Sequence, residues 1–294
     1  MKNVNTIPIS VTEQLKKVAV KNGESLDVLA HNYIQERWLY RLSISSYQEK
    51  FLLKRDHLIA ALTNGSIKPS TVITLSAKQM TDDVNMLQHV FEEICAIEAP
   101  ADGVNFKVDE LKITAEKEEI HIVIPVILDQ KNTYIEILVS YGDHHILAPK
   151  TVTVPTLLDM GSPKVLACSA ETIIAEKFEA MIRLEDIENR MKDFYEVYLL
   201  LETQNIEGRV LQEAVLEIFN LRRTRIEKDQ LVLSKEFYLD QQRNKQWNTY
   251  KSDQSVTFEE TIKRLQKALL PIYEVILTED EFFGNWDCKL RDWK

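Results

Sequence analysis

The hydrophobic pattern of this chain changes its period twice, and this change constrains the fold more than any other feature. Up to about residue 64 the apolar residues recur at helical spacing, as at Val11, Leu15 and Val18. Between about 104 and 141 they alternate with polar residues or form β-branched runs, and after about 170 the helical spacing returns. Period two is typical of strands and a period near 3.6 of helices. The sequence therefore predicts an α+β protein: helices, then a sheet, then helices only.

The expected sheet consists of four segments, 71–75, 111–115, 120–128 and 134–141. The last three are joined by connections too short for a helix, so they predict an antiparallel meander. Helices are expected over 11–22, 25–42, 47–63, 81–96, 171–184, 189–202, 207–221 and 258–277. Thr81 is expected to cap the fourth of these.

A stretch rich in proline separates the sheet from the later helices. It contains Pro149, Pro155, Gly161 and Pro163. We expect the domain boundary there, with one domain over 1–160 and a helical C-terminal domain over 161–294.

Composition excludes several classes of protein. Only 7 of the 294 residues are glycine, and none belongs to a G-x-G-x-x-G or P-loop pattern, so a Rossmann or P-loop nucleotide site is not expected. The 3 cysteines are far apart, which is typical of buried thiols in a reducing compartment. Neither a secretory signal nor an apolar run of membrane-spanning length is evident, so we expect a cytoplasmic protein without membrane contact.

Few side chains stand out chemically. Lys177 lies at the edge of the apolar stripe of its helix, where a lysine commonly snorkels, and Asp193 falls near the start of the next helix. Arg222, Arg223 and Arg225 form a basic cluster in a chain of net charge -10, either a solvated helix end or a contact for RNA. The pair His144–His145 is read as a solvated turn rather than a metal site.

Four motifs resemble the AbiEii/AbiGii toxin family, whose members have a nucleotidyltransferase fold and belong to bacterial abortive-infection and type IV toxin–antitoxin pairs. The segments are Tyr40-Arg41-Leu42-Ser43 with 51–54, Ile94–Ile97 with 102–104, 155–159 with 175–181, and 190–195. The resemblance implies a nucleotidyltransferase-like mixed or antiparallel sheet, with Lys177 and Asp193 matching catalytic motif residues and Lys54 matching a nucleotide-binding lysine. It also implies a partner, a small winged-helix antitoxin.

The chain departs from the family where its active members bind metal. Arg55-Asp56 follow Lys54 in place of two glycines, and Val72, Thr74 and Leu138 stand where three carboxylates are expected to hold Mg²⁺. This predicts a catalytically degenerate toxin-family protein that needs no cofactor, in which Lys177 and Asp193 form a structural ion pair. Two alternatives remain open. One is an active enzyme that uses Mg²⁺ and NTP through Glu136 or Asp82. The other is a non-catalytic module that binds a partner or RNA.

Overall fold

The structure is a computed structural model that describes residues 10–80, 83–116, 119–141, 149–183, 187–228, 230–251 and 255–294. The chain divides into two compact units, formed mainly by residues up to Ala167 and by residues from Cys168 onward. Within the described ranges, each helix is too short or too polar to cross a bilayer.

The first unit is built on an eight-stranded sheet in the order β3-β5-β6-β2-β1-β8-β7, with β4 paired to β5. Its strands are β1 Phe51–Lys54, β2 Val72–Ala77, β3 Val104–Phe106, β4 Lys112–Glu116, β5 Glu119–Leu128, β6 Lys131–Ser140, β7 Lys150–Thr153 and β8 Lys164–Ala167. Its helices are α1 Val11–Asn22, α2 Leu26–Ile44, α3 Arg55–Leu62 and α4 Val84–Ala96, with 3-10 turns at Pro100–Asp102 and Val108–Glu110.

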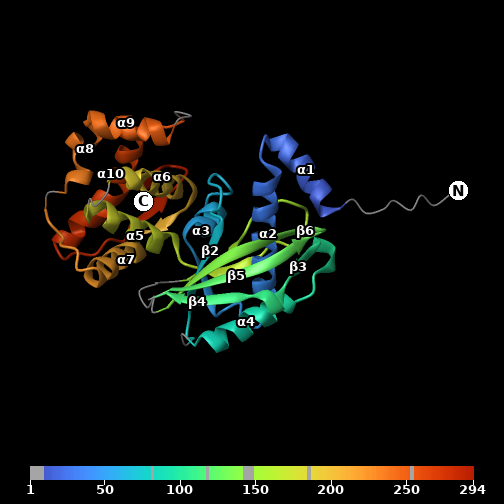
Figure 1. The fold of residues 1–294 in the computed structure, drawn as a ribbon. Coiled ribbons are helices and arrows are strands. Elements are labelled where there is room, and N and C mark those ends of the chain that lie inside the picture. The colour runs from blue at the N-terminus through green and yellow to red at the C-terminus, as the bar shows by residue number, and fades with distance from the viewer. Residues whose placement is uncertain are drawn as a thin grey trace. The chain divides into compact units, whose positions relative to one another are not determined.

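The sheet is mixed, and its centre is the expected meander. β4 and β6 both pair antiparallel with β5, and Figure 1 shows the long strands β5 and β6 side by side. β2 runs parallel to β6, and β1 runs parallel to β8. The predicted α+β class and the predicted meander are confirmed.

One face of the sheet forms the core of this unit. Alternate residues of β5 and β6, such as Ile122 and Ile137, are fully buried. Phe51 of β1 packs edge-on against Phe91 of α4, whose ring stacks on Trp38 of α2. Both helices thus cover the same face, and the residues at the intervening strand positions lie on the other face.

The prediction of a helix over 47–63 is wrong for the first half of that range. Residues 51–54 form strand β1, and α3 begins only at Arg55. Phe51, Leu52 and Leu53 are all buried, so β1 is an apolar run between β2 and β8. Such short runs do not distinguish a strand from a helix by period, and pairing with distant strands decided the outcome.

The expectation of helices only after residue 141 is also wrong. β7 and β8 extend the sheet from the proline-rich stretch, and β8 pairs with β1, more than a hundred residues earlier. Strands of four residues are too short for the alternation of apolar and polar residues to be recognised in the sequence. The first compact unit therefore extends to Ala167, while a division into domains at 160/161 stays a prediction.

The start of α4 differs from the expected one. The side chain of Asp83 accepts hydrogen bonds from the backbone N–H groups of Asn85 and Met86, so Asp83 caps the helix. Thr81, the expected cap, lies outside the described residues, as does Asp82.

The second unit is mainly helical. The four long helices expected there are confirmed, whereas two short helices and a small three-stranded sheet were not expected. Its elements are α5 Ala170–Arg183, α6 Ile187–Thr203, α7 Gly208–Leu221, α8 Lys235–Leu239, α9 Gln241–Tyr250, α10 Phe258–Leu277, β9 Ile206–Glu207, β10 Asn285–Asp287, β11 Asp292–Trp293 and a 3-10 turn at Leu231–Leu233.

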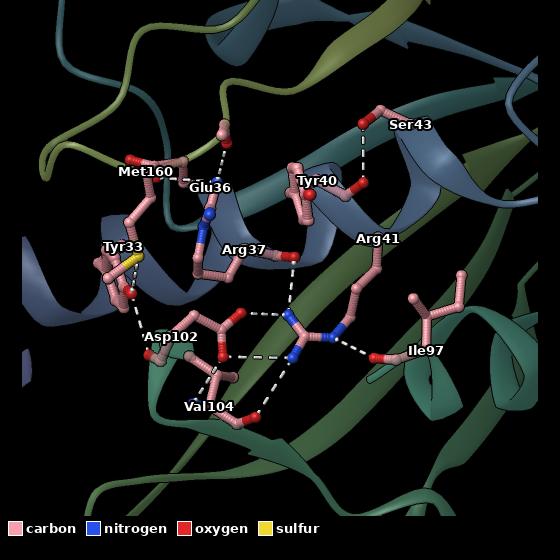
Figure 2. Close-up of polar contacts among 11 residues, drawn as sticks. Tyr33, Glu36, Arg37, Tyr40, Arg41, Ser43, Ile97, Asp102, Val104 and Met160 are labelled. Carbon is pink, nitrogen blue, oxygen red and sulfur yellow. Dashed lines mark hydrogen bonds and ion pairs between the residues drawn. The ribbon is translucent and has the colours of Figure 1, made fainter. Parts of the chain in front are cut away.

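A buried ion pair fixes α2 to the connection between α4 and β3. Arg41 Nη1 lies 2.7 Å from Asp102 Oδ2, and both side chains are 3% exposed. Figure 2 shows the same guanidinium donating to the carbonyl oxygens of Ile97, Arg37 and Val104. Buried charges are stable only when they are fully paired. The connection between α4 and β3 is therefore held in one position against α2.

The same helix also holds the segment before β8. Arg37 donates to Gly161 O at 2.6 Å, and the carboxylate of Glu36 accepts the Leu157 N–H at 2.8 Å. Burial raises the pKa of Glu36 to about 7 despite that bond. Tyr33, one turn earlier, donates to Asp102 O (Figure 2). Two distant segments are therefore anchored on one helix.

We predict that Asp102→Asn lowers the free energy of unfolding by about 3–5 kcal/mol, because it leaves the Arg41 charge buried without its counter-ion. The matched control is Asp27→Asn, which breaks the exposed ion pair with Lys131 and should have little effect. Urea unfolding of both variants provides the comparison. Equal losses in the two would contradict the structural role assigned to Arg41.

Candidate functional site

We call the face of the sheet opposite α2 and α4 the open face. Several positions that the sequence analysis singled out form one row on it. Lys54 is in register with Thr74, Thr74 with Leu138, and Leu138 with His121. Residues in direct register on neighbouring strands point to the same side of a sheet. Four side chains from β1, β2, β6 and β5 therefore line up across this face.

The three positions expected to hold metal do lie together. Val72 is in register with Glu136, two residues from the Thr74–Leu138 pair on each strand. Residues two apart on a strand share a face, so Val72, Thr74 and Leu138 are neighbours on the open side, opposite the buried Ile73 and Ile137. In this chain none of the three positions carries a carboxylate.

Among the acids on this face, Glu136 lies next to these three positions, and it is already paired. Glu136 Oε2 lies 3.0 Å from His121 Nε2, and both side chains are about 30% exposed. Across the described parts of the chain, no three acidic, histidine or cysteine side chains are arranged to hold a metal ion. Asp82, the other acid considered, and the pair His144–His145 lie outside the described residues.

The turn from β1 into α3 has an unusual backbone. Arg55 has φ 53°, the left-handed region that favours glycine. Such a conformation costs a residue with a Cβ about 1–2 kcal/mol. The side chain of Arg55 reaches Glu119 at the start of β5, with 3.2 Å between Nη2 and Oε1.

In the second unit, Lys177 and Asp193 meet as predicted. Lys177 Nζ on α5 lies 2.7 Å from Asp193 Oδ1 on α6, and each side chain is 17% exposed. Burial acts to lower the pKa of Lys177, but the carboxylates of Glu196 and Asp193 outweigh it and raise that pKa above 10.5. The turn between the helices, at 185–186, lies outside the described residues.

Glu196 is a partner that the sequence analysis missed. Its Oε2 lies 2.5 Å from Lys177 Nζ, and the side chain is fully buried. Arg190 contacts the other oxygen of Asp193 at 3.1 Å and Lys192 Nζ lies 3.7 Å from Glu196 Oε1, so three cations and two carboxylates form one network. The signal was present in the sequence, because positions 193 and 196 lie three apart on a helix and share a face.

The basic cluster after α7 is only partly available to a ligand. Arg222 Nη1 lies 2.6 Å from Glu179 Oε2, a fully buried carboxylate of α5 that also pairs with Arg183. Thr224 bonds the same side chain. Arg222 is therefore bound to the protein itself, while Arg223 and Arg225 are exposed.

A family model described as the nucleotidyl transferase AbiEii toxin of type IV toxin–antitoxin systems matches residues 73–269, more than half of the chain. The chain belongs to this family. The match includes β2, the meander and the helices that carry Lys177, Asp193 and Glu196. Proteins of the AbiEii family are toxins paired with an antitoxin, and the nucleotidyltransferase reaction normally uses a metal ion and NTP. No curated protein matches the chain.

Solved structures share the fold at low sequence identity. The chain is similar to JHP933 from Helicobacter pylori, with 12% identity, a TM-score of 0.50, and 87% of this chain and 95% of that one covered. A nucleotidyltransferase-like antigenic protein from Paracoccidioides brasiliensis is 14% identical, with a TM-score of 0.37 and coverage of 74% and 92%. The likeness to JHP933 supports the nucleotidyltransferase-like fold.

We predict that Glu196→Gln destabilises the protein by about 1–3 kcal/mol near pH 8, because it removes a buried, charge-assisted contact. The raised pKa of Lys177 contributes stability that is complete below about pH 10.5 and is lost as pH rises through the folded-state value. The variant should therefore begin to lose stability at a lower alkaline pH than the natural chain.

Urea unfolding between pH 8 and 11.5 measures both effects. Glu259→Gln is the control, since it removes an exposed partner of Lys263 on α10. An unchanged alkaline profile in Glu196→Gln would show that Glu196 does not act on Lys177.

Proposed function

We propose that this AbiEii-family protein is catalytically degenerate and acts without transferring a nucleotide. The observation that carries the proposal is the identity of three neighbouring residues on the open sheet face. Val72, Thr74 and Leu138 share that face by strand register and cannot supply carboxylate ligands.

The energetic argument concerns the metal. Mg²⁺ prefers oxygen ligands, is bound in such sites through carboxylates and substrate phosphates, and neutralises the charge that develops on the phosphates. Loss of one carboxylate can leave a slow enzyme. With three uncharged residues instead, a metal bound to a triphosphate has no anionic support at these positions.

Under this proposal Lys177, Asp193 and Lys54 are retained for structure rather than for catalysis. Lys177 is already compensated by Asp193 and Glu196 at 2.7 and 2.5 Å. A phosphate would have to displace a buried carboxylate to reach its ammonium group. The network then serves to hold α5 and α6 in the arrangement that a partner binds.

One observation favours the alternative of a working nucleotidyltransferase. Glu136 lies on the open face beside Leu138, and the neighbouring His121 contacts it. A metal held by this pair would need further ligands from the substrate. The two functions differ in whether Mg²⁺ and NTP are bound at all.

We predict no Mg²⁺-dependent binding of ATP, CTP, GTP or UTP at micromolar concentration. Calorimetry with each nucleotide measures it. Incubation with labelled NTP, Mg²⁺ or Mn²⁺ and total tRNA then tests for transfer of label. Micromolar binding, or label transfer that Glu136→Gln abolishes, would establish the enzyme instead.

The family suggests an antitoxin as one partner, and the exposed arginines after α7 suggest RNA as another. We propose a winged-helix antitoxin encoded beside this gene, a cytoplasmic location, and a weak RNA contact through Arg223 and Arg225. Arg222 contributes less than expected, since the buried Glu179 holds it.

The RNA contact predicts that Arg223→Ala with Arg225→Ala weakens tRNA binding at low salt without loss of stability. Each lost phosphate contact should lower the salt dependence of the affinity by about one unit in the slope. Filter binding over a salt series measures it. Equal affinity of the natural and double-variant proteins would exclude this surface.

A further inference from the structure

An ion pair crosses the open face of the sheet. Arg55 follows β1, Glu119 begins β5, and β2 and β6 lie between these strands. Neighbouring strands are about 4.8 Å apart, so the backbones of β1 and β5 are about 14 Å apart. A contact of 3.2 Å between these side chains requires both to extend toward one another across β2 and β6.

Strand register indicates the face on which the pair lies. Glu119 is in register with Ser140, and Ser140 with Ser76. Glu119 therefore points to the same side as Thr74 and Leu138. Thr74 and Ser76, on the strand that the pair crosses, are 6% and 1% exposed. The line from Arg55 to Glu119 therefore crosses the two strands that carry Val72, Thr74 and Leu138.

The backbone directs Arg55 there. Its φ of 53° is a conformation that a residue with a Cβ adopts at a cost, so local preference does not explain it. The second charged pair on the face, His121 with Glu136, fills the space between β5 and β6. Lys112 and Glu116 of β4 also lie on this face, by their register with Val123 and Glu119, and Lys54 has an interaction of its own.

We infer that Arg55 is a specificity-determining residue, which closes this face to a metal-bound triphosphate independently of the missing carboxylates. The inference rests on the proposed loss of nucleotide transfer and names a second cause for it. The side chain of Arg55 extends across β2 and β6 to Glu119, so it takes up space that a metal-bound triphosphate would need above these strands, and it engages a carboxylate that could otherwise serve as a metal ligand. Restoring carboxylates alone would therefore not restore binding.

The test uses a double variant that carries Val72→Asp and Leu138→Asp. It is compared with a triple variant that carries Arg55→Gly as well. Both positions are half-exposed and flank Glu136, so three carboxylates result while the buried Thr74 is left unchanged. Binding of Mn²⁺ by electron paramagnetic resonance, and of ATP, CTP, GTP and UTP with Mg²⁺ by calorimetry, is measured after thermal unfolding shows that each variant is folded.

We expect binding at least tenfold tighter in the triple variant than in the double variant. Equal binding in the two, or none in either folded protein, would overturn the role of Arg55. Binding by the natural chain would instead overturn the proposed function, so the two failures are distinguishable. Arg291→Gly in the double variant is the matched control, because Arg291 is another arginine at positive φ and its ion pair is with Glu202 in the second unit.

A second measurement applies to the natural sequence if the carboxylate variants do not fold. Phenylglyoxal modifies accessible arginines, and mass spectrometry gives the rate at Arg55. Glu119→Gln should increase that rate several-fold while leaving the rate at Arg223 unchanged. An unchanged rate at Arg55 would show that the ion pair does not restrain this side chain, and the inference would fail.

Discussion

The buried ion pair between Arg41 and Asp102 is the interaction on which the first unit depends. It joins α2 to the connection that leads into β3, and it brings with it bonds to Ile97 and Val104. The same helix holds the segment before β8 through Arg37 and Glu36. Two of the family motifs, around 40–43 and 102–104, thus meet at one contact. Their retention has a structural reason whether or not the protein has enzymatic activity.

The sheet brings the departures from the family pattern together at one surface. Strand register brings Val72, Thr74 and Leu138 together on one face, so their replacements act on a single place. Arg55, the first residue of α3, directly follows β1 and contacts Glu119 at the start of β5. Under the proposed function, the missing carboxylates and the Arg55–Glu119 pair both act against binding of a metal-bound triphosphate.

In the second unit, buried ion pairs join neighbouring elements to α5, as they join neighbouring segments to α2 in the first unit. Lys177 pairs with two carboxylates of α6, whereas Glu179, two residues later and therefore on another side of the helix, pairs with Arg222 beyond α7. Two fully buried carboxylates of this unit, Glu179 and Glu196, have cationic partners. Breaking either network strands a charge in the interior, which explains why these residues can be retained without catalysis.

The sequence by itself determined the four long helices of the second unit, the meander, and the shared face of positions 72 and 74, because these depend on local periodicity. It also predicted the pairing of Lys177 with Asp193. Only the tertiary structure decided that 51–54 is a strand and that β7 and β8 belong to the sheet, since short strands are stabilised by pairing with distant segments. The same holds for Glu196 beside Lys177 and for Arg55 above the open face. Their partners lie 19 and 64 residues away in the sequence, so these contacts form only when the chain folds.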